Sequence, residues 1–156
     1  MATFQLVVNG ATRNVEAWDP DMPLLYALRN QLGLHAAKFG CGMAQCGSCT
    51  VLMNDAPVRS CVVTLTAAAG QRIVTAEGLG TIEKPHPVQA AFIAEQAAQC
   101  GYCTNGMVMT AVALLRTHPR PTREQAQQAL AGNLCRCGSH DRVLRAVQRA
   151  AETAKA

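Results

Sequence analysis

The placement of cysteine constrains this chain more than any other feature of its sequence. Eight cysteines occur among 156 residues, and seven of them lie in three short stretches. The stretches are GCGMAQCGSC (40–49), QCGYC (99–103) and GNLCRCG (132–138), and the eighth cysteine is Cys61. The first residues, MATFQLVVNG, lack the basic segment and apolar stretch of a secretory signal. Clumped cysteines in such a chain predict metal or redox chemistry rather than a disulfide framework.

Composition excludes several other classes of protein. Hydrophobic residues make up 49% of the chain, which is typical of a globular protein. The net charge of +4 is modest, and the basic residues are not interleaved with aromatic residues, so we expect no nucleic-acid partner. The longest apolar stretch, 107–115, is too short to span a bilayer. We expect synthesis in the cytoplasm without a signal, and any periplasmic location would require export together with a partner.

The first half of the chain has the pattern of a small mixed sheet with one helix. Asn9-Gly10 is a strong hairpin signal, and Asn54-Asp55 separates a second pair of strand-like segments. Pro23 is expected to open a helix that ends at Gly33. Its apolar stripe consists of Leu24, Leu25, Leu28 and Leu32. The predicted strands are 4–8, 12–17, 50–53, 58–62 and 72–76.

The second half has helical periodicity and no convincing strand. Thr122 and Gln125 form a predicted capping box, and Gly132 is expected to end that helix. The predicted helices are 87–98, 105–118, 122–131 and 139–154. We therefore predict an α+β protein with a first domain at 1–78, a linker at 79–86 and a helical domain at 87–156.

The first cysteine set follows the spacing C-x4-C-x2-C…C of plant-type ferredoxins. A [2Fe–2S] centre with two ferric ions, two sulfides and four thiolates is a dianion, so it needs hydrogen-bond donors around it. The glycines at 40, 42 and 47 allow backbone N–H groups to turn toward the sulfurs. Cys61 is expected to reach in from a strand. The predicted ligands are Cys41, Cys46, Cys49 and Cys61.

The second cysteine set lies between predicted helices. If two helical hairpins pack as a four-helix bundle, the pairs Cys100/Cys103 and Cys135/Cys137 meet at one end of it. These four thiolates can hold a second [2Fe–2S] cluster, and on spacing alone zinc remains an alternative. No histidine lies at ligand spacing from these cysteines, which excludes Rieske-type ligation.

Taken together, these motifs resemble the small iron–sulfur subunit of the xanthine oxidase family of molybdenum hydroxylases. The resemblance covers essentially the whole chain. It includes KFGCGMAQCGSCTV (38–51), RSC (59–61), EGLG (77–80), HPVQ (86–89), QCGYC (99–103) and GNLCRCG (132–138). It implies a plant-ferredoxin-like β-grasp domain followed by a four-helix bundle domain, each with one [2Fe–2S] cluster. It also implies a large partner subunit that holds a molybdopterin cofactor and hydroxylates the substrate with oxygen from water.

The resemblance also implies roles for single residues. The cluster of the helical domain lies next to the pterin, Gln99 hydrogen-bonds the pterin, and the Cys137 sulfur contacts it. Asn105 and His140 replace a common proline and tyrosine, as in the branch with isoquinoline 1-oxidoreductase, nicotinate dehydrogenase and membrane-associated aldehyde dehydrogenases. That branch implies an aldehyde or N-heteroaromatic substrate and a cytochrome c acceptor, the alternative being a flavin subunit. The chain alone is expected to have no turnover.

The sequence leaves two alternative functions possible, and it does not decide the role of one basic surface. The rivals are a free-standing ferredoxin-like electron carrier and a zinc-stabilised binding module, which iron and acid-labile sulfide contents would distinguish. Arg142, Arg145 and Arg149 lie on one face of the last predicted helix. They form either a solvated basic face or a docking surface for an acidic partner.

Overall fold

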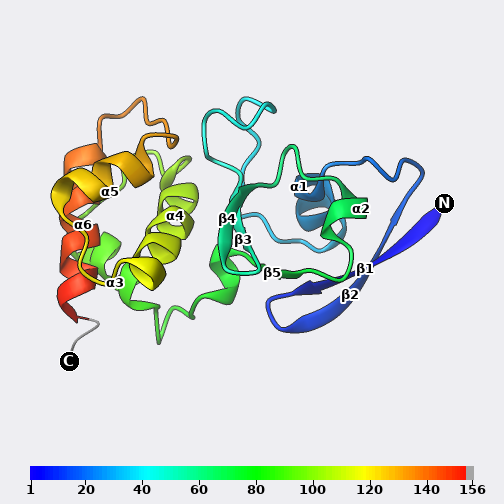
Figure 1. Ribbon diagram of the computed structural model, residues 1–156, viewed down its shortest axis with the longest axis horizontal. Coiled ribbons are helices and arrows are strands. Elements are labelled where there is room, and N and C mark those ends of the chain that lie inside the picture. Colours follow the sequence, from blue (N-terminus) through cyan, green and yellow to red (C-terminus); the bar gives the residue numbers. More distant parts are fainter. Residues whose placement is uncertain (154–156) are drawn as a thin grey trace.

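The computed structural model describes residues 1–153 and has two parts that lie side by side (Figure 1). One part holds the sheet and the short helices of the first half, and the other holds four longer helices. The N-terminus and the C-terminal helix lie at opposite ends of the molecule (Figure 1). This is the mixed α+β class predicted from the sequence. No helix within the described residues is long and apolar enough to cross a membrane.

The sheet has five strands in the order β2-β1-β5-β3-β4. The strands are β1 (Ala2–Val8), β2 (Ala11–Ala17), β3 (Thr50–Met53), β4 (Ala56–Arg59) and β5 (Arg72–Val74). β1 and β2 form the predicted hairpin, with Ala2 opposite Ala17. Positive φ at both Asn9 and Gly10 gives the two-residue turn that suits the twist of such a hairpin. β5 runs parallel to β1 and antiparallel to β3.

The second hairpin differs from the prediction in the position of its return strand. The turn residues Asn54 and Asp55 both have positive φ, so β4 begins directly after them at Ala56. β4 ends at Arg59, and the predicted strand over 58–62 is therefore wrong beyond that residue. Cys61 lies in the turn that follows β4 rather than in a strand. Pro57 fits β4 because this strand is at the edge of the sheet, where a missing N–H is tolerated.

The helix after Pro23 forms as predicted but changes its winding. It consists of α1 (Leu24–Tyr26) and a π-helical turn, η1 (Ala27–Gln31), and the N–H of Leu32 donates to the Ala27 carbonyl at 3.1 Å. Three of its four stripe leucines are fully buried in the core under the sheet, and Leu32 is half-buried. Two short helices were not predicted, α2 (Leu65–Ala68) and η2 (Ala76–Gly78).

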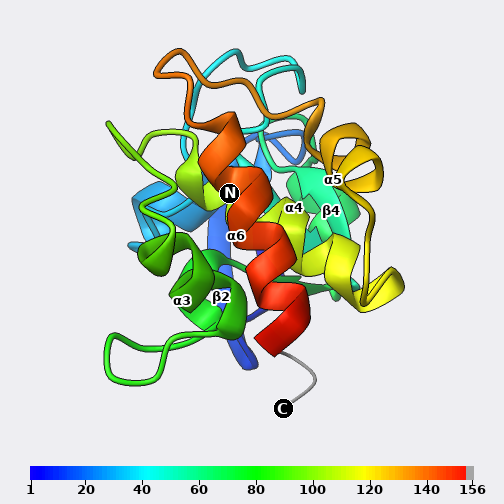
Figure 2. The ribbon, with the colours of Figure 1, turned by 90° about the vertical axis from the view of Figure 1, so that its left-hand side faces the viewer.

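Four helices form the second part, as predicted, but the first ends at Ala94 rather than at 98, because the backbone turns left-handed at Gln96. They are α3 (Pro87–Ala94), α4 (Thr104–Thr117), α5 (Arg123–Leu130) and α6 (His140–Thr153). The predicted capping box is present at the start of α5, and residue 154 of the last predicted helix lies outside the described residues. α6 lies in front of α4, with α3 and α5 on either side of it (Figure 2). The apolar face of α6 is buried against these helices.

The two parts share a core. α4 packs against β3, and Leu52 of β3 is buried in the same apolar cluster as the helix residues. A second cluster lies between the other face of the sheet, α1 and α2. The loop at 40–49 and the loop at 132–139 lie along the same edge of the molecule, at the top of both views (Figures 1 and 2). The fold therefore brings the first and third cysteine stretches to one place.

Candidate iron–sulfur sites

The loop between η1 and β3 directs backbone N–H groups at one cysteine sulfur. The N–H groups of Met43, Gln45 and Cys46 donate to the Cys41 Sγ at 3.4, 3.2 and 3.3 Å. The N–H of Cys41 donates to the Cys46 Sγ at 3.4 Å. The N–H groups of Met43, Cys46 and Gln45 lower the pKa of the Cys41 thiol from 9.0 to about 6. This loop therefore stabilises the thiolate form of Cys41, which is the form of cysteine that binds a metal.

The inner side of this site is formed by two buried cysteines. Cys49 precedes β3 and Cys61 follows β4, and both are buried. Burial raises the pKa of Cys49 to about 11, and the neighbouring Cys61 and Cys46 thiols add to the rise. The structure thus brings together all four predicted ligands of the first site, as the pairs Cys41/Cys46 and Cys49/Cys61.

Two glycines of this loop leave room that a side chain would fill. A Cβ at Gly40 would lie 2.6 Å from the Cys46 Sγ. Gly47 has a φ of +78°, and a Cβ there would lie 2.4 Å from the side-chain nitrogen of Asn133. Gly40 therefore lets the backbone approach the Cys46 sulfur, and Gly47 lets it approach the second cysteine loop at Asn133.

The second cysteine set converges from two loops. Cys100 and Cys103 precede α4, with Cys103 as its N-cap, and Cys135 and Cys137 precede α6. Cys100 interacts with Cys137, and Cys103 interacts with Cys135, so side chains of the two stretches lie near one another. Burial raises the pKa of Cys103 to about 12, and Cys135 adds to the rise.

At Cys135, hydrogen bonds that stabilise the thiolate outweigh the effect of burial, which favours the neutral thiol. Burial by itself raises the pKa of this thiol, but the Ser139 hydroxyl and backbone N–H outweigh it and lower the pKa to about 6. The Cys135 Sγ and the Ser139 Oγ are 3.3 Å apart. The N–H of Tyr102 likewise lowers the pKa of Cys100. The second site therefore also holds sulfurs with hydrogen-bond donors aimed at them.

The donor sets fit [2Fe–2S] clusters. All eight cysteines are free. They approach one another in four pairs, which matches two thiolates for each iron of a two-iron centre. No group of three or more His, Cys, Asp or Glu side chains within residues 1–153 has the arrangement of a site for one metal ion. Positive iron among these sulfurs would remove the penalty for ionising the buried thiols Cys49 and Cys103.

The two sites are joined by hydrogen bonds between their loops. The N–H of Leu134, next to Cys135, donates to the carbonyl of Cys46 at 2.9 Å. The side-chain amide of Asn133 donates to the Gly47 carbonyl at 3.3 Å, and Arg59 donates to the Gly132 carbonyl at 3.0 Å. The Tyr102 hydroxyl donates to the carbonyl of Phe39. These hydrogen bonds hold the loops of the two sites against one another.

Sequence reasoning missed four of the residues that join the sites. Asn133 is buried and accepts from the Thr110 hydroxyl, which fixes its amide toward Gly47. A Cβ at Gly106 would lie 2.1 Å from the Gly47 carbonyl oxygen, so only glycine lets α4 approach the first loop this closely. Arg59 and Tyr102 are the other two. Each lies within or beside a cysteine motif, which was the only signal available.

Other predicted residues have defined places. Gln99 is exposed in the middle of the α3–α4 connection, directly before Cys100. His140 begins α6, and its Nε2 lies 3.0 Å from the Asn133 carbonyl oxygen. Asn105 donates to the Ala36 carbonyl at 3.0 Å, a bond that the proline common at this position cannot make. His86 caps α3.

Comparison with known proteins agrees with this geometry. Residues 6–77 match a 2Fe-2S iron-sulfur cluster binding domain, and residues 75–148 match a [2Fe-2S] binding domain. One chain of the nicotinate dehydrogenase of Pseudomonas putida is 58% identical over 97% of this chain and 96% of its own. The alpha chain of isoquinoline 1-oxidoreductase from Brevundimonas diminuta is 45% identical over 97% and 99%. A chain of quinoline 2-oxidoreductase from Pseudomonas putida 86 superposes with a TM-score of 0.91, at 39% identity over 99% and 96%.

The fold, the cysteine pairs and the two domain matches define an iron–sulfur protein with two [2Fe–2S] clusters. The chain belongs to the small iron–sulfur subunits of the xanthine oxidase family of molybdenum hydroxylases. It is therefore one component of an oxidoreductase complex.

Proposed function

We propose that the two cysteine quartets are the cluster ligands through which this protein passes electrons from the molybdopterin centre of a large subunit to an acceptor. When bound, the clusters supply reversible one-electron transfer. One quartet is Cys41, Cys46, Cys49 and Cys61. The other is Cys100, Cys103, Cys135 and Cys137.

One observation carries this proposal, the direct bond between the two cysteine loops. The Leu134 N–H and the Cys46 carbonyl join the residue before one predicted ligand to the backbone of another at 2.9 Å. A protein that used its metals only for stability would have no need of such a short connection between the sites. Gly47 and Gly106 allow this proximity because neither carries a side chain.

We further propose that the second site faces the large subunit. Gln99 and Cys100 are exposed, and Tyr102 and Leu134 beside the second set are apolar and 47% and 60% exposed. Large apolar side chains exposed around a site are typical of a surface that a partner covers. Gln99 and Cys137 would then contact the pterin, as the resemblance implies.

The finer predictions complete the proposal. The names of the relatives favour an N-heteroaromatic substrate over an aldehyde. Asn105 and His140 support a cytochrome c acceptor rather than a flavin subunit, and co-export with the large subunit would bring the chain to that acceptor. The boundaries at 78 and 86, the β-grasp topology and the bundle arrangement of the four helices belong to the proposal as well.

Purification of the native complex tests the function. We expect iron and acid-labile sulfide in equal amounts, about four of each per chain, and co-purification with a molybdenum-containing chain. Zinc without sulfide would instead identify a zinc-stabilised module. A chain that has both clusters but purifies alone would identify a free-standing electron carrier.

A further inference from the structure

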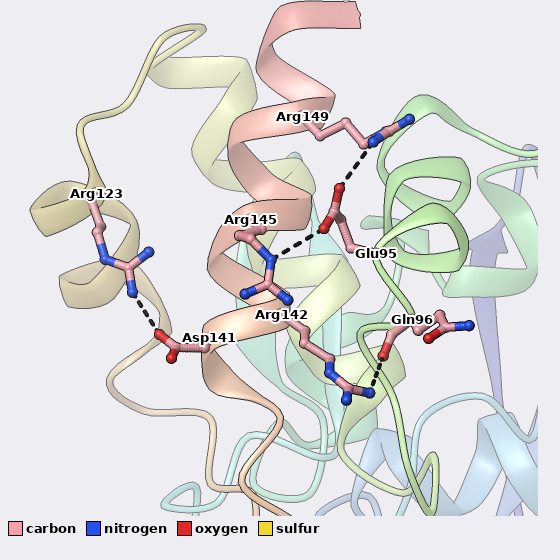
Figure 3. Close-up of polar contacts among 7 residues, drawn as sticks. All are labelled: Glu95, Gln96, Arg123, Asp141, Arg142, Arg145 and Arg149. Carbon is pink, nitrogen blue, oxygen red and sulfur yellow. Dashed lines mark hydrogen bonds and ion pairs between the residues drawn. The ribbon is translucent and has the colours of Figure 1, made fainter.

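Three arginines of α6 hold the two residues that follow α3. The Glu95 carboxylate accepts from Arg145 at 3.2 Å and from Arg149 at 3.0 Å. One turn earlier, Arg142 donates to the Gln96 carbonyl at 3.4 Å. Figure 3 shows the three guanidinium groups reaching from α6 toward this one segment. We call Glu95, Arg142, Arg145 and Arg149 the arginine clamp.

The segment inside the clamp has a backbone that needs support. The N–H of Ala97 donates to the Phe92 carbonyl and that of Gln96 to the Ile93 carbonyl, which is the Schellman end of a helix. Glycine usually occupies the left-handed position of this motif, but here it is Gln96, with a φ of 49°. Arg142 bonds the carbonyl of this strained residue. The clamp therefore fixes the direction in which the chain leaves α3.

That direction determines where Gln99 and Cys100 lie. Gln99 is exposed, and no hydrogen bond within residues 1–153 fixes its side chain. Glu95 is half-buried in the clamp: its side chain is 20% exposed, whereas those of Arg145 and Arg149 are 53% and 54% exposed. A shielded carboxylate between two arginines holds its geometry better than an isolated surface pair.

We propose that the arginine clamp is a positioning device that sets Gln99 and the second cluster at the correct place against the cofactor of the large subunit. This inference rests on the proposed function, because it presupposes that the second site faces that subunit. Glu95 and the arginines act through the segment 95–100 and touch no reacting atom. The two interpretations of the arginines left open by the sequence, a solvated face and a docking surface, both treat them as unpaired, whereas two of them share one carboxylate.

The test uses the purified complex with Glu95→Ala and with the double variant Arg145→Ala/Arg149→Ala. Asp55→Asn is the matched control, because the Asp55 carboxylate also bridges two arginines, Arg72 and Arg116, on the far side of α4. Two readouts are recorded. They are hydrogen exchange of the peptide 95–100, and the magnetic coupling between molybdenum(V) and the reduced second cluster after partial reduction with dithionite. The affinity of each variant for the large subunit is measured separately.

Both clamp variants are expected to speed exchange of 95–100 about tenfold and to change the coupling, with iron content unchanged and Asp55→Asn like wild type. A tenfold faster exchange corresponds to a loss of about 1.4 kcal/mol in the free energy of local opening. Faster exchange with unchanged coupling would show a purely structural role and overturn the proposal. Opposite effects of the two variants on complex affinity would also overturn it, because docking to an acidic partner gains from Glu95→Ala and loses from the double variant.

Failure of the proposed function would look different. Wild-type complex would then lack molybdenum or iron, and no coupling would exist to be changed. If wild-type complex shows coupling and both clamp variants match it in both readouts, the function stands and the clamp is rejected.

Discussion

At Gly106, the absence of one side chain determines how close the two parts of the molecule can come. The Gly47 carbonyl oxygen occupies the place where a Cβ would stand, at 2.1 Å. The neighbouring Asn133 side chain bonds that same carbonyl, so the oxygen cannot move aside without losing the bond. Single atoms at this contact therefore control the geometry of both cysteine loops.

Gly106→Ala is expected to lower the free energy of unfolding by about 1–3 kcal/mol, because the added methyl group must push α4 away from the first loop. Urea unfolding monitored by circular dichroism measures the change. Gly70→Ala is the control, since it adds strain at positive φ but meets no atom within 4 Å. An unfolding midpoint for Gly106→Ala equal to that of wild type would contradict the close approach.

Cys137→Ser is expected to lose the second cluster and keep the first, so that iron falls from about four to about two per chain. In the complex it should also slow reoxidation of the molybdenum centre. Iron analysis and visible spectra measure the loss, with Arg136→Ala, an exposed neighbour, as the control. Wild-type iron content in Cys137→Ser would show that this ligand assignment is wrong.

At the scale of elements, α3 has a distinctive residue at each end. His86 caps its start, where the ring Nδ1 accepts from the Val88 N–H at 3.2 Å. Gln96 lies in the left-handed region at its end. A protonated ring has no acceptor to offer, and a glutamine lacks the conformational freedom of glycine. Both ends can therefore be tested by substitution.

Stability is expected to fall below about pH 6.5 in a manner that depends on His86. Burial and the nearby charge of Arg116 lower the pKa of His86 from 6.5, so the unfolded chain binds this proton more readily than the folded chain. The contribution of His86 is complete above the unfolded-state pKa and is lost as the pH falls through the folded-state value. The measurement is the free energy of unfolding in urea at about pH 7.5 and about pH 5.5, on either side of the ordinary histidine pKa.

His86→Asn serves as the comparison for this pH effect, because asparagine caps a helix at both pH values. Acid also affects the cysteine sites, so the informative quantity is the difference between wild type and His86→Asn at each pH. At the lower pH, wild type should lose more free energy of unfolding than His86→Asn does. A difference that does not change with pH would contradict the assignment.

Gln96→Gly is expected to raise the free energy of unfolding by about 1 kcal/mol, since glycine adopts the left-handed conformation without strain. The Arg142 bond to the backbone carbonyl is retained in this variant. Ala94→Gly, in the last turn of α3, should instead destabilise by about 1 kcal/mol. If both substitutions destabilise equally, the left-handed strain at Gln96 is not significant.

Element prediction from the sequence succeeded where the signal was local. Asn-Gly and Asn-Asp turns, apolar periodicity and the Thr122–Gln125 box located the strands and helices. The π-helical turn at Ala27–Gln31 has no local signal in the sequence. The return strand of the second hairpin was placed too late: it begins at Ala56 and contains Pro57, which an edge strand tolerates. Asn133 and Gly106 could not be identified, since their roles depend on contacts with residues far away in sequence.

At the scale of the whole molecule, the two parts behave as one body. Leu52 and Ala76 from the sheet half belong to the helical core, and the bonds between the cysteine loops close the same interface at its edge. Between the halves, the predicted linker contains an exposed tip, with Ile82 at 96% exposure. The linker is therefore exposed to solvent, whereas the interface between the two parts is buried.

Cleavage at a protease site placed at residues 82–84 is expected to leave the two fragments associated, because the shared core and the loop bonds do not depend on the linker. Gel filtration after cleavage measures this, with the uncleaved variant as the reference. Elution of two separate fragments would show that the parts are independent domains held only by the chain between them.

The bond from Leu134 to Cys46 has a consequence for how such chains diversify. A peptide N–H forms it, so every amino acid except proline could supply the donor. The side chain at 134 points outward instead and is largely exposed. A substitution at 134 can therefore reshape this surface to suit a different large subunit without loss of the connection between the redox sites beneath it.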